Sequence, residues 1–210
     1  GSHVQKIVLQ AKGVTKRFGG ITALENAELE VREGEVHALV GANGAGKSTL
    51  IKIITGAYTN DEGHIYLDGK EVSVKSTFDA RALGISAVYQ EFSLINTVSV
   101  AENIFMGKLL YNNLGPVPRV DWKKMNEETQ KLLDSLGVKN IRPETIVGRL
   151  SVAQKQMVEI AKALSNKLKV LIMDEPTASL SDNEIENMFQ IIRDLKAKGI
   201  SIIYVSHRLE

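Results

Sequence analysis

The run Gly41-Ala-Asn-Gly-Ala-Gly46-Lys47-Ser48 decides most of what the sequence predicts about this chain. It matches the pattern G-x-x-x-x-G-K-[ST] in full. The apolar run at residues 36–40 before it predicts a buried strand, and Ser48 to Thr55 after it predicts a helix. Such a loop lets successive backbone N–H groups point at phosphate oxygens, while Lys47 adds a cation and Ser48 a hydroxyl for Mg²⁺.

By itself the pattern indicates a site for a nucleoside triphosphate. The alternative is a glycine-rich turn with a chance lysine, which the flanking strand and helix disfavour. The predicted phosphate contacts are Gly41, Asn43, Gly44, Ala45, Gly46, Lys47, Ser48 and Thr49.

The composition excludes several classes of protein. The chain has 210 residues, enough for one domain with a sizeable core and a subdomain. Lys and Arg number 26 and Asp and Glu 25, so no global basic field favours nucleic acid. There is no cysteine, which excludes disulfides, zinc–thiolate sites and a thiol nucleophile and fits a reducing compartment. No apolar run approaches the ~18 residues that span a bilayer, and no signal peptide is visible.

Three further apolar runs predict buried parallel strands, because they are short, β-branched and nearly continuous. They are Ile85-Ser-Ala-Val-Tyr89, Val170-Leu-Ile-Met173 and Ile200-Ser-Ile-Ile-Tyr-Val205. Helices are predicted between them. Asp121 can cap one that Gly137 ends, and Ser181 with Glu184 has capping-box spacing before another that Gly199 ends. The first of these helices has its predicted apolar face on Trp122, Met125, Leu132, Leu133 and Leu136.

The N-terminal part alternates between apolar and polar residues, which predicts an antiparallel sheet beside the parallel core. The alternating stretches are Lys6 to Gly13, Ala27 to Val31 and His64 to Val74, with turn signals at Glu33-Gly34, Glu62-Gly63 and Asp68-Gly69. Residues 91–165 lack strong strand signals and predict helices, with an exposed connector at Tyr111 to Pro118. The predicted fold is therefore α/β: a mixed core with a β-subdomain (about 4–90 and 166–210), interrupted by a helical subdomain (about 91–165). Residues 1–3 read as a cloning scar.

A second element of a phosphate site follows the strand at residues 170–173, which runs into Asp174 and Glu175. Asp174 would hold Mg²⁺ and steer it between phosphate oxygens. Glu175, one residue further along an alternating strand, could orient and deprotonate an attacking water. Taken alone, two acids at the end of a strand are as consistent with solvated surface residues as with a metal ligand and a general base. The upstream phosphate loop favours the second interpretation.

Leu150-Ser-Val-Ala-Gln154 opens an amphipathic helix with capping-box spacing between Ser151 and Gln154. On physical grounds alone this is more simply a capped core helix than a binding element. An exposed helix N-terminus is nevertheless an anion site, and it could meet a phosphate held by another chain.

The order of these elements resembles the ATP-binding domain of ABC transporters. After the phosphate loop come Gln90, like the family's glutamine loop, and Leu150–Gln154, where the family has its LSGGQ signature. Asp174-Glu175-Pro176-Thr177 and His207 in Val-Ser-His follow, and Phe18 in Val-Thr-Lys-Arg-Phe resembles an adenine-stacking aromatic. The resemblance implies a P-loop NTPase core of the RecA-like type.

The same resemblance implies a role for each residue. Phe18 would present a ring face to adenine. Gln90 would bind Mg²⁺ or the attacking water, and His207 would contact the γ-phosphate. Each of these three has a plain alternative: a core aromatic, an unremarkable strand-end glutamine and a solvated histidine. The signature residues Ser151, Ala153 and Gln154 would act on the ATP of a facing domain.

The chain departs from the family pattern where Val152 and Ala153 replace two glycines and Ser181 stands where most relatives have aspartate. Since valine is poor at positive φ, a backbone contact there must use ordinary helical geometry. These variants resemble the first of two fused ATPase domains in bacterial monosaccharide importers of the ribose and galactose type. Since relatives continue past the histidine, we expect the rest of this domain and a second ATPase domain to lie outside the sequence.

The function implied is Mg²⁺-dependent ATP hydrolysis that energises monosaccharide import, on the cytoplasmic face of the inner membrane. The implied partners are permease subunits, a second ATPase domain in a head-to-tail sandwich and, indirectly, a sugar-binding protein, with no nucleic acid. Apolar side chains that could dock a permease helix, or equally form subdomain core, are Phe92, Leu94, Ile95, Phe105 and Met106.

Two other classes remain open at this point. One is an ABC-type ATPase that acts on nucleic acid or ribosomes, although the zinc-binding cysteines, coiled-coil insertions and basic linkers expected there are missing from this sequence. The other is a nucleotide-binding regulator without turnover, against which Glu175 argues.

Overall fold

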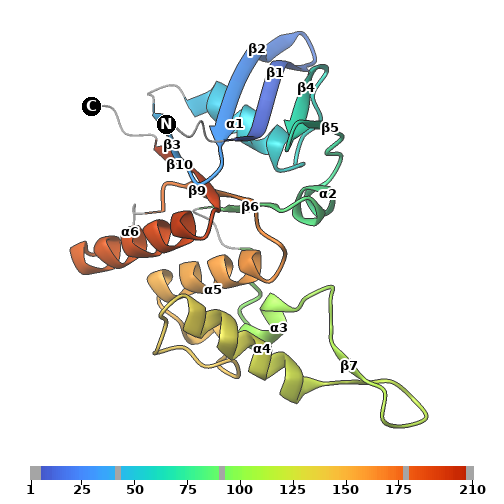
Figure 1. The fold of residues 1–210 in the computed structure, drawn as a ribbon, viewed down its shortest axis with the longest axis vertical. Helices are drawn as coiled ribbons and strands as arrows, with labels where there is room; N and C mark the ends of the chain where they lie inside the picture. Colours follow the sequence, from blue (N-terminus) through green and yellow to red (C-terminus); the bar gives the residue numbers. More distant parts are fainter. Residues whose placement is uncertain (1–5, 41–43, 90–92, 177–179, 207–210) are drawn as a thin grey trace. The chain divides into compact units, whose positions relative to one another are not determined.

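The computed structural model describes residues 6–40, 44–89, 93–176 and 180–206, and the chain divides into two units. The core unit comprises Gly1–Tyr89, Lys167–Glu175 and Phe189–Glu210, and the helical unit comprises Gln90–Asn166 and Pro176–Met188. Figure 1 labels the elements of both. None of the helices in the described ranges combines the length and apolar character needed to cross a membrane.

A four-stranded parallel sheet forms the centre of the core unit, in the order β3-β10-β9-β6. Its strands are β3 (Val36–Val40), β6 (Ile85–Val88), β9 (Val170–Asp174) and β10 (Ser201–Ser206). The continuous apolar runs predicted these strands correctly, and the four residues 170–173 are fully buried. A strand needs such a run when both faces of the sheet are covered.

The other four strands of the core unit form an antiparallel sheet in the order β2-β1-β4-β5, as the alternating pattern predicted. It consists of β1 (Ile7–Phe18), β2 (Ile21–Arg32), β4 (Glu62–Leu67) and β5 (Lys70–Val72). The first strand continues five residues beyond the predicted end at Gly13. It does so through register shifts against both neighbours, which interrupt the simple alternation.

One predicted turn, at Glu62-Gly63, is wrong. Glu62 and Gly63 are the first two residues of β4 rather than part of a loop, and they lie beside the register shift between Lys12 and Thr15. Gly63 has φ of 92°, and a Cβ there would lie 2.4 Å from the carbonyl oxygen of Gly13. Glycine is needed at this point because two backbones cross too closely for any side chain.

Helix α1 (Gly44–Ile54) shares one buried cluster with both sheets. Ile53 and Ile54 of this helix, Leu9 of β1 and Ile172 of β9 are at most 1% exposed and belong to that cluster. Each side chain of this kind contributes about 1.5–3 kcal/mol by leaving water. The helix that follows the glycine-rich loop is therefore held by the core on which both sheets pack. The remaining helix that begins in this unit is α2 (Thr77–Ala82).

The helical unit contains three α-helices, a 3₁₀ turn and a small hairpin among its described residues. They are α3 (Val100–Ile104), α4 (Trp122–Ser135), α5 (Val152–Leu164), η1 (Val147–Arg149), β7 (Tyr111–Asn112) and β8 (Arg119–Val120). The predicted connector at Tyr111 to Pro118 is thus most of a two-stranded hairpin. Helix α6 (Asp182–Ala197) begins in this unit and ends in the core unit.

The predicted helix caps are confirmed. The Asp121 carboxylate accepts from the N–H of Lys124 at 3.0 Å, and Ser181 and Glu184 exchange side-chain-to-backbone bonds at the start of α6. Ser99 and Glu102 form a further capping box at α3 that the same four-residue spacing could have predicted.

Asp68, in the turn between β4 and β5, ties the antiparallel sheet to the start of β9. Its carboxylate contacts the ammonium groups of Lys169 and, at 3.2 Å, Lys6. The Lys169 hydrogen bond is the main reason why the pKa of Asp68 lies below its usual value. Because Lys169 is 46% exposed, solvent screens the pair, and we expect it to contribute at most about 1 kcal/mol.

We expect Gly63→Ala to lower the free energy of unfolding by about 2–4 kcal/mol, through the backbone clash and the left-handed φ together. Gly69→Ala is the matched control, since Gly69 has φ of 80° but nothing within 4 Å of an added Cβ. It should lose only about 1 kcal/mol. Urea unfolding followed by circular dichroism measures both, and equal losses would contradict the close approach.

Asp68→Asn tests the ion pair through its pH dependence. A lowered folded-state pKa means that the carboxylate stabilises the fold fully above its ordinary pKa of about 3.9, and that this contribution disappears as the pH falls through the lower value. The variant should therefore be less stable than the wild type by up to about 1 kcal/mol at pH 7, with the gap closing in acid. Glu127→Gln, an exposed acid on α4, controls for the loss of one negative charge. A gap that persists unchanged in acid would exclude the ion pair as its cause.

Candidate functional site

The carboxyl ends of all four parallel strands meet at one edge of the sheet in the core unit. The register pairs Ser206 with Val40, and Val205 with Asp174, while Val88 lies beside Met173. Parallel strands run in one direction, so the segments that leave them start from the same edge. The strands before the phosphate loop, Gln90 and His207, and the strand that ends at Asp174, therefore all end there.

Lys47 joins this edge from the first turns of α1. Its Nζ donates to the carbonyl oxygen of Ser206 at 3.4 Å, where β10 ends. Ser48 is half-buried in the same turn, and Thr49 is 8% exposed. Gly46 has room for a Cβ, whose nearest neighbour would be Leu24 at 3.8 Å. The fold itself therefore leaves space at Gly46.

The other residues predicted for the phosphate loop are described less fully. Gly44 and Ala45 form the start of α1. Gly41 and Asn43 lie outside the described residues, as do Gln90 and His207. For these four residues, the structure describes only the strands that precede them in the chain.

Asp174 and Glu175 are both half-buried at the end of β9, but they do not continue one alternating strand. β9 ends at Asp174, and Glu175 has φ of 44°, in the left-handed region. The Glu175 N–H donates to the carbonyl oxygen of Val205 at 2.8 Å, which holds the turn against β10. A non-glycine residue pays about 1–2 kcal/mol for this conformation. The direction of the Glu175 side chain is thus set by a strained turn, which the simple strand pattern missed.

Phe18 lies at the end of β1, 44% exposed, and contacts two side chains. Its ring meets Tyr58 edge to face at 5.2 Å between centroids, and the Lys16 Nζ lies 5.1 Å from its centroid. Phe18 is therefore a partly exposed ring, not the fully buried core aromatic of the alternative interpretation. Tyr58 was not predicted, because its contact with Phe18 joins distant parts of the chain.

The signature residues belong to the helical unit. Ser151 caps α5, its Oγ accepting from the Gln154 N–H at 3.2 Å while the Gln154 Oε1 accepts from the Ser151 N–H at 2.9 Å. Val152 and Ala153 lie in regular helix, as their departure from glycine predicted. The capping box is therefore confirmed, and Ser151 and Gln154 already use these groups within the chain.

Two polar residues buried on the same helix were missed. Glu159, 7% exposed, accepts from the N–H and Oγ of Ser93 at 3.0 and 3.1 Å. Gln156, 5% exposed, donates to the carbonyl oxygen of Pro176 at 2.9 Å. Pro176 directly follows Glu175, and Ser93 lies three residues after Gln90. α5 thus fastens two segments next to predicted site residues.

The apolar side chains proposed for docking a permease helix separate into two groups. Leu94 and Phe105 are each 8% exposed and form subdomain core, whereas Ile95 and Met106 are each 43% exposed. Phe92 lies outside the described residues.

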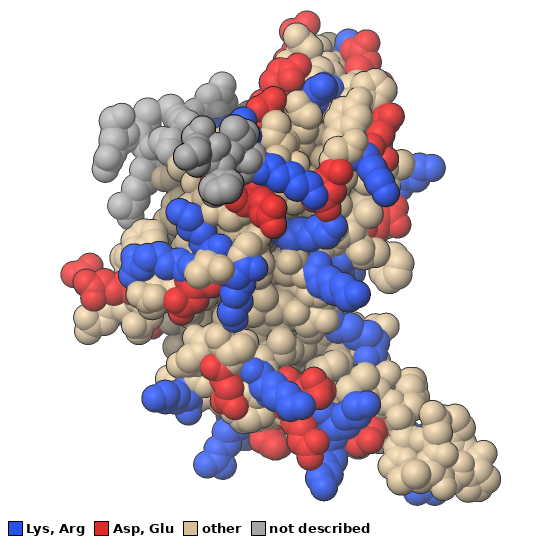
Figure 2. All heavy atoms as spheres, viewed as in Figure 1, with Lys and Arg blue, Asp and Glu red and all other residues tan. Residues whose placement is uncertain are grey.

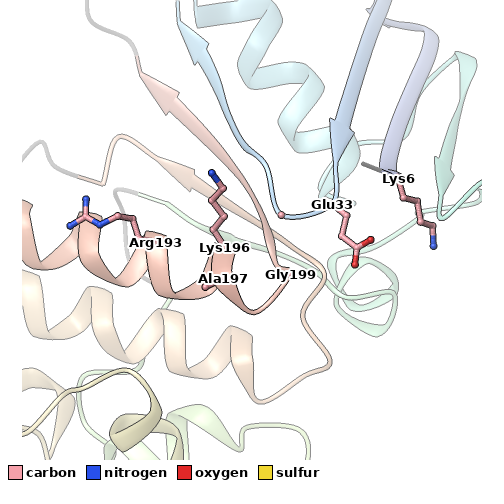
Figure 3. Close-up of a pocket in the computed structure, with 7 residues that line it drawn as sticks. Lys6, Glu33, Arg193, Lys196, Ala197 and Gly199 are labelled. Carbon is pink, nitrogen blue, oxygen red and sulfur yellow. The ribbon is translucent and has the colours of Figure 1, made fainter. Parts of the chain in front are cut away.

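A cavity of about 530 Å³ in the core unit lies at the opposite edge of the parallel sheet (Figure 3). Its lining includes Gly34 and Gly199, each two residues before a parallel strand, with Glu33, Arg193 and Lys196. None of the described site residues lines this cavity. The predicted site therefore lies where the parallel strands end, whereas this pocket lies where two of them begin.

Comparison with known sequences places this geometry in a family. The profile described as ABC transporter matches residues 24–178. The ribose import ATP-binding protein of Rubrobacter xylanophilus is 48% identical over 97% of this chain. The galactose/methyl galactoside import ATP-binding protein of Clostridium tetani is 47% identical over 97%. In both cases the chain spans 40% of the relative's length.

Solved structures agree with the sequences. A nucleotide-free ATP-binding cassette from an ABC transporter superposes with a TM-score of 0.82 and 30% identity, covering 97% of this chain and 82% of that one. A cassette described as a dimer in a post-hydrolysis state bound to ADP and Pi gives 0.75 and 27%, covering 95% and 88%. The predicted fold class and family resemblance are thus both confirmed, and the chain belongs to the ABC transporter family as an ATP-binding cassette.

Proposed function

We propose that this chain is an ATP-hydrolysing domain that energises the import of a monosaccharide through an ABC transporter. The observation that carries the proposal is the parallel register, which ends the strands of four predicted motifs at one edge of the sheet. The relatives named above for ribose and galactose import support the substrate class. No relative or structure named above favours the nucleic-acid or ribosome alternative.

The described residues of this edge suit a magnesium–triphosphate ligand. The Ser48 hydroxyl and the Asp174 carboxylate are oxygen donors, which Mg²⁺ prefers, and both belong to elements that meet at this edge. When bound, the ion would neutralise charge on the phosphate oxygens. Lys47 would add a fixed cation there, together with the backbone N–H groups of the phosphate loop.

Glu175 is the proposed general base. Its backbone is held in a left-handed turn by the bond to Val205, so its side chain leaves the backbone in a direction that the strand's alternation does not set. Such preorganisation is what a group that orients water needs, since phosphoryl transfer depends mainly on positioning and charge stabilisation. Gln90 and His207 are proposed to complete the site, because the strands before them end at the same edge.

Phe18 is the proposed adenine contact. It presents a partly exposed ring that Tyr58 supports from the edge. An aromatic platform of this kind can stack on a base without reading a specific hydrogen-bond pattern.

Assembly follows from the same proposal. Ser151, Ala153 and Gln154 at the start of α5 would contact the nucleotide of a second cassette, in line with the dimeric state described for one structural neighbour. The chain spans 40% of the length of each of these relatives, so each of them is long enough to hold a second cassette. Permease subunits would be bound at the membrane's cytoplasmic face, with Ile95 and Met106 as exposed apolar contacts.

We expect Glu175→Gln to bind Mg-ATP like the wild type but to release phosphate about 10²–10³-fold more slowly, as when one transition-state contact is removed. Lys47→Ala should instead lose nucleotide binding. Calorimetry measures binding and a coupled phosphate assay measures turnover. Glu186→Gln, an exposed acid on α6, is the matched control and should change neither quantity. Turnover of Glu175→Gln within about twofold of the wild type would remove Glu175 from this role.

The left-handed backbone at Glu175 leads to a separate prediction about the free energy of unfolding. Glycine tolerates φ of 44°, whereas alanine does not, so Glu175→Gly should be more stable than Glu175→Ala by about 1 kcal/mol. At Asp174, in regular strand, the order should reverse. Urea unfolding of the four variants tests this, and the same order at both positions would show that Glu175 is not left-handed.

A further inference from the structure

The β7–β8 hairpin projects from the helical unit between α3 and α4 (Figure 1). Tyr111 pairs with Val120 and Asn112 with Arg119, and residues 113–118 form its tip. Neither the proposed nucleotide site nor the helical core uses these residues.

The hairpin is a formed element that does not depend on burial of its own tip. The Asn112 Oδ1 accepts from the Leu114 N–H at 2.9 Å, and the Asp121 N–H donates to the Leu110 carbonyl oxygen at 2.7 Å. Two prolines flank Val117 and restrict the backbone there. The tip is thus presented in a defined conformation.

Apolar side chains on this hairpin face solvent. Leu114 is 94% exposed, Val117 64%, Tyr111 55% and Trp122, where α4 begins, 50%. Trp122 was expected on the apolar face of its helix, so its exposure is a departure from the pattern. Leu114, Val117 and Trp122 also line one hollow of about 460 Å³. A cluster of this kind marks an interaction surface more often than a chance arrangement.

The charges around the tip are mainly positive, and the one acid that lines the hollow, Asp121, is half-buried and caps α4. No acidic residue occurs between Glu102 and Asp121, while Arg119, Lys123 and Lys124 flank the apolar tip and all three are exposed. On the face shown in Figure 2, the projecting lobe that corresponds to this hairpin is almost free of red and blue atoms. The surface of the hairpin is therefore apolar at its tip and mainly basic at its base.

We propose that the β7–β8 hairpin is a membrane-interface contact that inserts Leu114 and Val117 among lipid headgroups. Apolar side chains at the tip, amphipathic aromatics behind them and cations at the base follow the polarity profile of an anionic bilayer surface. A groove on a protein would also accept the tip, but it would match the cations only where acidic side chains line its rim, whereas an anionic bilayer carries that charge over its whole surface. The inference rests on the proposed function for the presence of a membrane near this chain.

The chain carries its own probe, because Trp122 is its one tryptophan. On addition of vesicles of phosphatidylcholine with phosphatidylglycerol, we expect its emission to shift to the blue and the protein to sediment with the vesicles. Vesicles of phosphatidylcholine alone should bind about tenfold more weakly, and added salt should reduce the difference.

Variants separate the two parts of the surface. Leu114→Asn combined with Val117→Asn should reduce vesicle binding by about tenfold or more. Phe78→Asn on α2 is the matched control, since Phe78 is 71% exposed but belongs to the core unit. Replacing Arg119, Lys123 and Lys124 by glutamine should remove the preference for anionic lipid. Unfolding curves in urea verify that each variant is folded.

Either of two outcomes would overturn the proposal. One is that the emission of Trp122 does not change with anionic vesicles, and the other is that the double variant binds these vesicles as tightly as the wild type does. If emission shifts only with vesicles that contain the permease, the occupant is a protein and the lipid assignment is wrong. ATP binding measured on the same samples without vesicles should be the same for the double variant and the wild type. If the wild-type protein binds no nucleotide, the proposed function is wrong, but the vesicle result remains valid.

Discussion

Parallel pairing of β3, β10, β9 and β6 is the constraint on which the rest of this structure depends. Because the four strands run in one direction, every segment that leaves them starts from one edge. Parallel strands must be covered on both faces, and the fully buried run at residues 170–173 meets that demand. The same burial that stabilises the sheet therefore also brings together the ends of the strands that precede the phosphate loop, Gln90 and His207, with the strand that ends at Asp174.

Chain crossings between the two units coincide with the predicted chemistry. The chain leaves the core unit after Tyr89 and again after Glu175, beside two residues proposed for catalysis. Just beyond these crossings, Glu159 and Gln156 of α5 bind Ser93 and Pro176. Buried polar groups need such partners, so these bonds are stable as well as directional. The helix that carries the signature residues is consequently tied to both segments.

Much of the fold could be predicted because local patterns depend on residues a few positions apart. Capping boxes at Ser151 and Ser181, the β-branched strands and the phosphate-loop pattern all belong to this class. Prediction failed where distant contacts override local preference. Gly63 lies in a strand because the backbone of β1 approaches it closely there. Burial of Gln156 and Glu159 likewise depends on partners far along the chain.

The sequence by itself determined which residues can hold a phosphate, cap a helix or fill a buried strand, since these properties belong to the side chains and their immediate neighbours. Only the tertiary structure decided that β10 lies between β3 and β9, that Lys47 reaches Ser206 and that Tyr58 meets Phe18. It also decided the left-handed turn at Glu175, which the bond to Val205 holds. Strand order and register arise from packing between segments far apart in the chain, and no local pattern encodes that geometry.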